Sequence, residues 1–339
     1  MNVKLNIVII LSFILVCQSC TVVKRMIKYG TEDIYDYQIF PYTEIHVGNK
    51  TFQFKQGHDE TLKNYTVKAM GRYQSDTIDL TLDDFLKTTG TISFLIIRND
   101  SILFERYYKG HGQSRISTVF SISKSVTSLL TGLAIDEGYI SSVQDTVTKY
   151  IPELKKKADG FQKLKIEDLL NMRSGLKFKE DYSNLVSKLR WANFYYGKNQ
   201  LKRISNMKFA HEPGEVREYQ SATTALLGIV LERAIGKELG KYLEEKIWIP
   251  LGMEYNATWS FDDNKNRSSK SYTGLNTTSI DLAKIGRLYL NKGNWDGNQI
   301  IDSLWILKSI TPDVINAGRQ YQWYSMSASL RNNVVLPIC

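Results

Sequence analysis

Cysteine and histidine are scarce in this chain of 339 residues, and their placement disfavours several kinds of site. The three cysteines, Cys17, Cys20 and Cys339, lie close to the two ends of the sequence. They offer neither a disulfide framework nor a cysteine metal site. The four histidines show no H-E-x-x-H spacing, which disfavours a zinc hydrolase. A G-x-S-x-G stretch is also missing, which disfavours an α/β-hydrolase. No cofactor is expected.

The chain does contain enough apolar residues for a large core. Hydrophobic residues make up 42% of the sequence and aromatic residues 12%, which predicts one large domain or two closely packed ones. The formal net charge is +9. Basic clusters such as residues 155–157 are interpreted as solvated faces, with attraction to an anionic envelope surface as the alternative. The sequence has no nucleic-acid-binding motif, so no nucleic-acid partner is expected.

The first twenty residues have the pattern of an export signal. Lys4 precedes a mostly apolar run, residues 5–16, that is too short for a comfortable membrane span. Ser19 followed by Cys20 is typical of a bacterial lipoprotein cleavage site, although Cys17 stands where Leu or Val is usual. Residues 1–20 are therefore predicted to be a lipoprotein signal peptide. Cys20 would carry the lipid and hold the protein on a membrane of the bacterial cell envelope, facing the periplasm or the exterior. A retained N-terminal anchor is the alternative.

The chemistry of the chain is predicted to centre on a helix that begins at Ser121. Apolar residues recur at helical spacing from Val126 to Leu133 and predict a buried amphipathic helix that ends near Gly138. Lys124 follows Ser121 by one turn on the same face. A partly desolvated lysine can take the proton of a serine hydroxyl, and a helix N-terminus favours negative charge on that oxygen. A solvent-facing serine and lysine are the alternative, because a bare S-x-x-K is common.

A second candidate group is Tyr219-Gln220-Ser221, which follows a Pro-Gly turn and precedes an amphipathic helix over residues 222–235. A tyrosine on a loop beside a helix start can act as an acid or a base. A hydroxyl two residues later can orient a substrate. A half-buried tyrosine that only packs is the alternative for this stretch alone.

Five stretches in a fixed order carry a resemblance that no single stretch carries. They are residues 121–124 (S-I-S-K), 169–176 (L-L-N-M-R-S-G-L), 213–221 with P-G and Y-Q-S, 226–232 (L-L-G-I-V-L-E) and 245–253 (E-K-I-W-I-P-L-G-M). In this order the chain resembles the β-lactamase-related serine hydrolases, which include class C β-lactamases, D-Ala-D-Ala peptidases, esterases and 6-aminohexanoate-dimer hydrolases. The similarity covers roughly residues 85–325.

The resemblance implies an α/β (α+β) fold of the β-lactamase/transpeptidase type, with helices flanking an antiparallel sheet and an additional all-α region. Residues 81–339 would form the hydrolase domain, with a helical subdomain at about 140–264, after a lead-in over residues 21–80. Residues 43–47 and 51–54 in that lead-in resemble a hairpin to which no chemistry is assigned. A stronger hairpin is predicted for residues 91–97 and 102–108. The resemblance makes its strands part of the core sheet against which the nucleophile helix packs.

Two further stretches are interpreted locally. Residues 277–290 read as a capped amphipathic helix. The aromatic run at residues 190–196 either walls a substrate cleft or packs beneath a loop.

The chain departs from the family pattern in three places. Ser221 stands where β-lactamases and peptidases usually carry asparagine; we predict Ser221 as a substrate-binding residue, with weak β-lactam turnover. The third motif, a Lys-Thr-Gly or His-x-Gly strand, is missing. Residues 270–274 are similar to it but do not count, because they precede the helix predicted at residues 277–290 and the motif should follow that helix. Residues 321–323 resemble the start of the strand before that motif, and little follows them. The resemblance therefore suggests that the last sheet strands are missing through a premature stop or frameshift near residue 324.

The expected mechanism is acyl transfer from a small-molecule or peptide substrate. Ser121 would attack an amide or ester carbonyl, Lys124 and Tyr219 would share the proton transfer, and the Ser121 backbone N–H would supply half of an oxyanion hole. Candidate substrates are a β-lactam, a D-amino-acid peptide or a carboxylic ester. The alternative function is a catalytically inactive envelope lipoprotein that binds peptidoglycan fragments or a protein partner.

Overall fold

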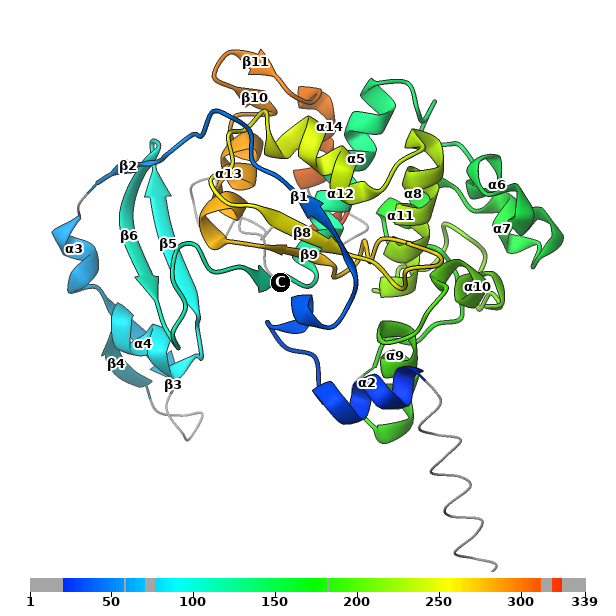
Figure 1. Cartoon of the computed structure of the whole chain (residues 1–339), viewed down its shortest axis with the longest axis horizontal. Helices are drawn as coiled ribbons and strands as arrows, with labels where there is room; N and C mark the ends of the chain where they lie inside the picture. The colour runs from blue at the N-terminus through cyan, green and yellow to red at the C-terminus, as the bar shows by residue number, and fades with distance from the viewer. Residues whose placement is uncertain (1–20, 58, 71–76, 182, 312–318, 325–339) are drawn as a thin grey trace, which may run out of the picture.

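The computed structural model describes residues 21–57, 59–70, 77–181, 183–311 and 319–324. The predicted signal peptide, the lipidation site Cys20 and the segment after residue 324 lie outside these residues, so those expectations stay predictions. In Figure 1 a small sheet lies in the middle of the molecule, a β-hairpin lies on the left and most helices lie on the right. Among the described residues no helix is both long and apolar enough to cross a membrane.

The middle sheet is antiparallel and has the strand order β1-β8-β9-β7. These strands are β1 (Tyr42–Ile45), β7 (Ser117–Thr118), β8 (Ala257–Ser260) and β9 (Leu275–Thr277). The hairpin predicted for residues 43–47 and 51–54 is wrong, because β1 pairs with β8, with Tyr42 opposite Ser260. The side chains of residues 51–54, the expected second strand, pack elsewhere. Phe52 lies against Trp295, with ring centroids 5.0 Å apart, and Phe54 packs in a small cluster with Ile102 and Ile280.

The hairpin predicted for residues 91–108 is confirmed. It consists of β5 (Ser93–Arg98) and β6 (Ser101–Tyr107), joined by Asn99 and Asp100, which both have positive φ, as a tight hairpin turn requires. The hairpin does not enter the middle sheet within the described residues, contrary to what the resemblance implied. Instead β6 pairs in parallel with β2 (Lys55–Gln56). The hairpin turn is held by α13 (Ser279–Leu290), where Arg287 binds the Asp100 carboxylate through two nitrogens at 2.7 and 2.8 Å.

Eight further short elements of the described residues lie outside the middle sheet and the β5–β6 hairpin. They are η1 (Asp36–Gln38), α3 (Glu60–Lys63), β3 (Thr66–Met70), β4 (Thr77–Thr81), α4 (Leu82–Thr88), β10 (Asn294–Trp295), β11 (Asn298–Gln299) and α14 (Ser303–Ile310). The capped helix predicted for residues 277–290 is confirmed as α13, where the Thr278 side chain accepts a hydrogen bond from the Asp281 N–H. Such an N-cap satisfies a backbone donor that the helix itself leaves unpaired.

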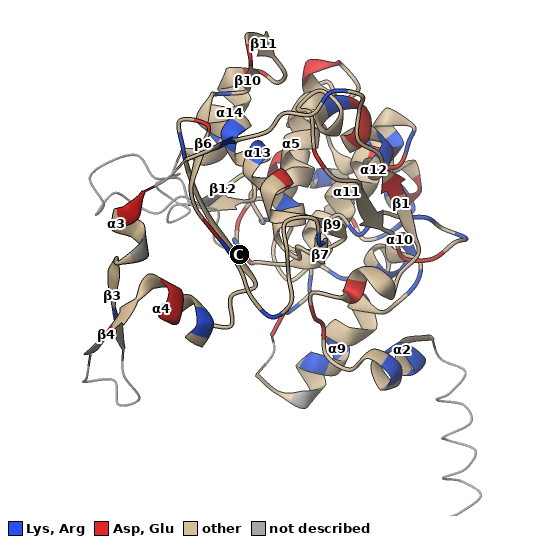
Figure 2. Cartoon of the chain, turned by 60° about the vertical axis from the view of Figure 1, so that its left-hand side comes forward, with Lys and Arg blue, Asp and Glu red and all other residues tan. Residues whose placement is uncertain are grey.

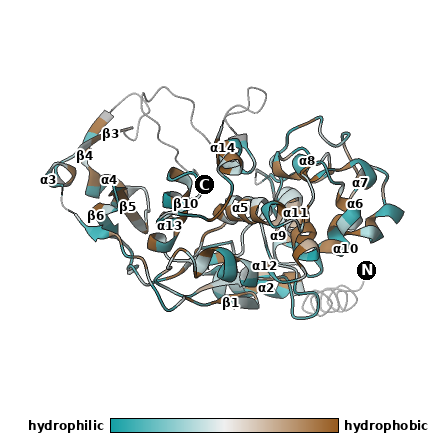
Figure 3. Ribbon diagram, turned by 90° about the horizontal axis from the view of Figure 1, so that it is seen from above, coloured by the Kyte–Doolittle hydropathy of each residue, from teal (hydrophilic) through white to brown (hydrophobic). Residues whose placement is uncertain are grey.

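Two buried helices form the centre of the molecule, α5 (Ile122–Asp136) and α11 (Ser221–Ile235). Both were predicted from their apolar spacing, and α5 is followed by Gly138 with φ +75°. Figure 3 shows hydrophobic residues on these helices inside the molecule. Gly132 of α5 lies flat against the Trp305 ring, where even a Cβ would overlap. This close packing restricts how far α5 can slide or rotate relative to Trp305. Because Ser121 is the N-cap of α5, its position is restricted as well.

The remaining helices surround this pair. They are α6 (Val147–Tyr150), η2 (Pro152–Lys156), α7 (Gly160–Lys163), α8 (Ile166–Leu170), α9 (Leu185–Tyr195), α10 (Gln200–Ser205), α12 (Leu239–Leu243) and the π-helical turn η3 (Glu244–Trp248). Figure 2 shows basic residues on α9. Basic and acidic residues occur together in η2 and η3. Lys155, Lys156 and Lys157 are exposed, as expected for a solvated face.

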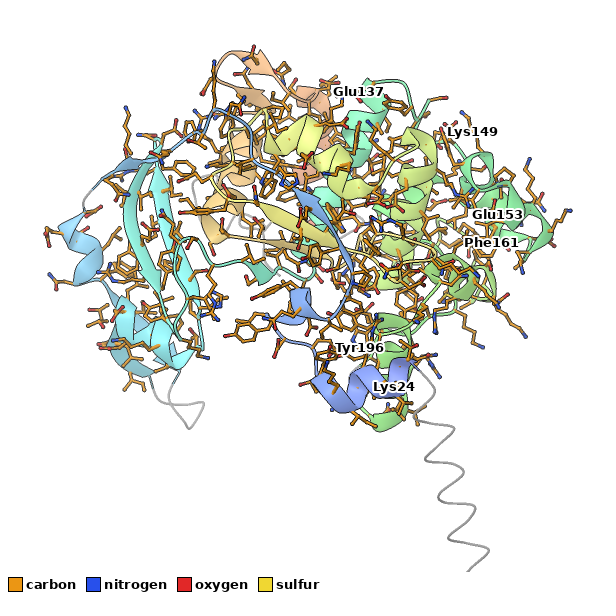
Figure 4. The ribbon with its side chains drawn as sticks, viewed as in Figure 1. Lys24, Glu137, Lys149, Glu153, Phe161 and Tyr196 are labelled. Carbon is orange, nitrogen blue, oxygen red and sulfur yellow. The ribbon has the colours of Figure 1, made fainter. Side chains whose placement is uncertain are left out.

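The N-terminal segment is packed into the fold through α9. Helix α2 (Thr21–Tyr29) lies beside Tyr196 (Figure 4), whose backbone oxygen accepts a 2.8 Å hydrogen bond from Arg25. Trp191 and Phe194 of α9 are 6% and 3% exposed. Of the two interpretations of the aromatic run at residues 190–196, the structure favours packing, because none of these residues lines the cavity described below.

Lys270 is enclosed by aromatic rings where the N-terminal segment, α9 and the turn at residues 270–274 meet. Its side chain is 1% exposed, and Nζ donates to the Tyr195 carbonyl at 2.6 Å and to the Tyr272 hydroxyl at 2.9 Å. The same nitrogen lies 4.2 Å from the centre of the Phe40 ring. Burial lowers the pKa of Lys270 to about 7, because an amine removed from water is harder to keep charged.

The substitution Lys270→Met tests this buried amine through the pH dependence of folding. Between the folded pKa of about 7 and the ordinary value of 10.5, the unfolded chain holds a proton that the folded protein lacks. The contribution of Lys270 to stability therefore rises with pH across this window, by at most about 1.4 kcal/mol per pH unit, and is constant below it. Urea unfolding at pH 7, 8.5 and 10 should show the wild-type protein gaining stability relative to Lys270→Met. A difference that stays constant with pH would contradict this account.

Candidate active site

Ser121 lies at a sharp turn between strand β7 and helix α5. The residue before it, Phe120, has φ +43°, a conformation that is strained for a bulky side chain. The turn places Ser121 at the N-cap of α5, where its side chain does not cap the helix. The half-buried hydroxyl is therefore available for other partners.

Lys124 is buried beneath Ser121, one turn along α5. The side chain is 2% exposed, and Nζ donates to Ser121 Oγ at 2.9 Å. The same nitrogen donates to the backbone oxygen of Tyr272 at 3.1 Å. The predicted spacing of serine and lysine on one helical face therefore produces a direct hydrogen bond between them.

Tyr219 reaches the same hydroxyl from the loop before α11. Its hydroxyl lies 2.7 Å from Ser121 Oγ, and either oxygen can be the donor. Lys124 Nζ lies 4.9 Å from the centre of the Tyr219 ring. The structure thus brings together three of the residues singled out from the sequence, Ser121, Lys124 and Tyr219, although the first and last are 98 positions apart.

The loop that carries Tyr219 is attached to the segment that follows α8. Gly214 N–H donates to the Arg173 oxygen at 2.8 Å, and Glu218 N–H donates to the Met172 oxygen at 2.9 Å. Gly175 has φ +70°, and a Cβ at this position would overlap the backbone oxygen of His211. The L-L-N-M-R-S-G-L stretch, recognised only as part of the family pattern, therefore supports the Tyr219 loop.

Ser221, predicted to bind substrate, is turned away from this cluster. It is completely buried, its backbone N–H donates to Glu180 Oε2 at 2.6 Å, and its hydroxyl donates to Glu180 Oε1 at 3.1 Å. Ser221 is not among the residues that line the cavity at Ser121. The sequence reasoning missed Glu180, because nothing in its neighbourhood signals a contact 41 positions away.

A cavity of about 300 Å³ opens beside Ser121 and Lys124. Its other lining residues are Ile122, Ser125, Leu170, Asn171, Met172, Arg217, Tyr219, Gln320, Tyr321, Gln322, Trp323 and Tyr324. Most of these side chains are apolar or aromatic, and Arg217 adds a guanidinium. The space next to the Ser121 hydroxyl is therefore suited to a small, partly apolar molecule.

One wall of the cavity is a hairpin of β12 (Arg319–Gln320) and β13 (Trp323–Tyr324). The expectation that residues 321–323 begin a strand is confirmed only at Trp323, where β13 begins. Tyr321 and Gln322 instead form the hairpin turn, with φ +45° and +67°. The buried Gln322 side chain fixes this turn, donating to the Leu169 oxygen at 3.0 Å and accepting from the Thr224 hydroxyl at 2.8 Å.

The run at residues 270–274, set aside as a false third motif, forms a turn against α5. Its contribution to the site is the backbone oxygen of Tyr272, which accepts the hydrogen bond from Lys124. The sequence after α13 contains neither a Lys-Thr-Gly nor a His-x-Gly run. In the described part of the chain, no three His, Cys, Asp or Glu side chains are grouped in a way that could hold a metal ion.

The amino-acid sequence is similar to known proteins of one family. A sequence model described as Beta-lactamase matches residues 78–331. The chain is 28% identical over 235 residues to the 6-aminohexanoate-dimer hydrolase of Paenarthrobacter ureafaciens, which covers 66% of this chain and 58% of that protein. It is 26% identical over 285 residues to the Beta-lactamase-like protein 2 of Dictyostelium discoideum, covering 71% and 50% of the two chains. The chain thus spans about half the length of the curated relatives that it matches.

The fold is also found among solved structures. A protein described as "Putative 6-aminohexanoate-dimer hydrolase from Bacillus anthracis" superposes with a TM-score of 0.72 at 22% identity, over 84% of this chain and 76% of that one. A likeness at this identity establishes the β-lactamase/transpeptidase-like fold with its helices and antiparallel sheets.

Gly175→Ala tests whether the 171–175 segment holds the Tyr219 loop in place. A Cβ at this position would push against the backbone oxygen of His211, and the positive φ adds strain, together about 1–3 kcal/mol of lost stability. Gly138→Ala is the matched control, because Gly138 has φ +75° but nothing near its Cβ. Chemical unfolding should show a larger loss for Gly175→Ala. Equal losses would mean that backbone strain alone accounts for the effect.

Proposed function

Because the chain belongs to the β-lactamase family, we propose that it is a serine hydrolase that forms an acyl-enzyme at Ser121. The observation that carries this proposal is the position of the Ser121 hydroxyl, which lies within hydrogen-bonding distance of both Lys124 Nζ and the Tyr219 hydroxyl, at 2.9 and 2.7 Å. A serine hydroxyl becomes an effective nucleophile when an adjacent base can take its proton.

In the proposed acylation, Ser121 Oγ attacks the carbonyl carbon of an amide or ester and forms a new C–O bond. The hydroxyl proton passes to Lys124 in its neutral amine form or to Tyr219 as phenolate. The same pair returns a proton to the leaving amine or alcohol as the scissile bond breaks. Water then attacks the acyl carbon, the C–O bond to Ser121 breaks and the carboxylic acid leaves, while the same groups carry the proton of the water to Ser121 Oγ.

The negative charge that develops on the carbonyl oxygen needs donors already in position. The Ser121 backbone N–H stands at the N-terminal end of α5, where the helix dipole also favours negative charge. We assign this N–H to one half of the oxyanion hole.

The substrate class that these features support is a small carboxylic amide or ester. The cavity beside Ser121 holds about 300 Å³ and is mostly apolar, which suits an acyl group of a few carbon atoms better than a polymer. The relative from Paenarthrobacter is named for hydrolysis of an amide dimer. A β-lactam, a D-amino-acid peptide and a carboxylic ester remain the three substrate classes to compare.

Covalent labelling of the purified protein tests the proposed nucleophile. We expect a fluorophosphonate or a fluorescent penicillin to add one adduct, which mass spectrometry should locate on Ser121. Ser121→Ala should lose the adduct while remaining folded. The probe that reacts faster indicates esterase-like or peptidase-like chemistry. A folded wild-type protein that reacts with neither probe would contradict the proposal and favour a binding function.

Lys124→Met and Tyr219→Phe test the two groups proposed to move the proton. Each should lower the rate of Ser121 acylation by about 10²–10⁴-fold, the range that acid–base groups typically contribute. The larger loss identifies the group that takes the hydroxyl proton. Circular dichroism should confirm that both variants fold, and acylation at the wild-type rate in Lys124→Met would exclude Lys124 as the base.

A further inference from the structure

The Tyr219 hydroxyl can meet Ser121 only if the backbone around residue 219 is fixed. Four hydrogen bonds donated by residues 218–221 end on one short segment, residues 172–180. Glu218 N–H donates to the Met172 oxygen at 2.9 Å, and the Gln220 side chain donates to the Leu176 oxygen at 3.0 Å. The other two bonds run from the Ser221 N–H and hydroxyl to Glu180, and of these four bonds only they depend on an ionisable side chain.

Helix α11 lacks a side-chain cap of its own. Gln220 occupies the N-cap position with extended backbone angles, and its side chain makes no capping hydrogen bond. The first N–H of the helix, that of Ser221, would be left without an acceptor inside a protein interior where Ser221 is 0% exposed. Glu180 supplies that acceptor from a loop 41 positions earlier in the chain.

Both carboxylate oxygens of Glu180 are engaged by the same residue. Oε2 accepts the Ser221 N–H at 2.6 Å and Oε1 accepts the Ser221 hydroxyl at 3.1 Å. Two parallel contacts fix orientation as well as distance, and a carboxylate is favoured at a helix N-terminus. Tyr219 is two residues from this contact, so a shift of the helix start would move its hydroxyl.

We propose that Glu180 is a positioning residue of the active site: by binding the backbone N–H and hydroxyl of Ser221, it sets the distance between the Tyr219 hydroxyl and Ser121. This inference rests on the proposed function for its catalytic consequence. It also assigns Ser221 a different role from the substrate contact predicted from the sequence. Serine suits this role because its short side chain reaches Glu180 while its own N–H binds the same carboxylate.

The test compares Glu180→Ala with Glu180→Gln. Removal of the carboxylate should lower kcat for a reporter ester by about 10–100-fold with KM changed less than about two-fold, because a misplaced proton-transfer group costs rate rather than binding. Glutamine keeps an acceptor for the Ser221 N–H and should retain activity within about three-fold. Glu215→Ala is the matched control, since Glu215 is an exposed carboxylate on the Tyr219 loop, and it should behave as wild type.

Ser221→Ala provides a second variant that keeps the backbone N–H bond. It should lose less activity than Glu180→Ala, and the double variant should be no worse than Glu180→Ala alone, because both changes disrupt one contact. Thermal unfolding should be recorded for every variant. If Glu180→Ala does not fold, the single variants Glu180→Gln and Ser221→Ala test the proposal: the first should stay within about three-fold of the wild-type activity, and the second should lower kcat without raising KM.

Crystal structures of the wild-type protein and Glu180→Ala measure the positioning directly, without a substrate. The distance from the Tyr219 hydroxyl to Ser121 Oγ should lengthen in the variant. An unchanged distance, a raised KM with normal kcat, or equal losses in Glu180→Ala and Glu180→Gln would each overturn the proposal. A wild-type protein that neither probe modifies at Ser121 would overturn the proposed function alone, while a lengthened distance would still support the positioning role.

Discussion

The candidate active site depends on one arrangement, in which Lys124 and Tyr219 both lie within hydrogen-bonding distance of the Ser121 hydroxyl. Lys124 comes from the same helix, so its 2.9 Å contact follows from helical geometry. Tyr219 is 98 positions away, and its 2.7 Å contact requires that α5 and α11 pack at a fixed separation. The close fit of Gly132 to Trp305 and the complete burial of Leu226 and Leu227 on α11 provide that rigidity. The hydrophobic core therefore serves as the scaffold of the polar site.

The loops around the site do the finer positioning. Residues 172–180 hold the Tyr219 loop, the turn at residues 270–274 supplies the carbonyl that receives Lys124, and Gln322 ties the β12–β13 hairpin to α8 and α11. Most of these contacts end on backbone oxygens, whose positions vary less than those of long side chains. The contact through Glu180 is an exception, because it ends on a side-chain carboxylate. Replacing Glu180 would remove this contact and leave the backbone contacts named above in place.

Sequence reasoning succeeded where the signal was local. The helix that begins after Ser121, the capped helix at residues 277–290 and the hairpin at residues 91–108 were all predicted, because spacing, capping and turn residues act over a few positions. It failed where the partner was distant. The strand at residues 42–45 pairs with residues 257–260, and nothing local reveals this choice. The contacts of Glu180 with Ser221 and of Lys270 with the Tyr195 carbonyl were missed for the same reason, since these partners lie 41 and 75 positions away.

The aromatic enclosure of Lys270 makes the beginning of the described chain an internal part of the protein. Phe40 covers the amine from one side, while Asp36 accepts a 2.5 Å hydrogen bond from the Tyr195 hydroxyl on another. A shortened protein that starts after Phe40 would open this enclosure to water, and the hydrated amine of Lys270 would more readily take up a proton. The turn at residues 270–274 would then lose the contacts of Lys270 that hold it. Water could then compete with Lys124 for the backbone oxygen of Tyr272. Removal of residues 21–40 would thus be expected to disturb Lys124, which binds the proposed nucleophile Ser121.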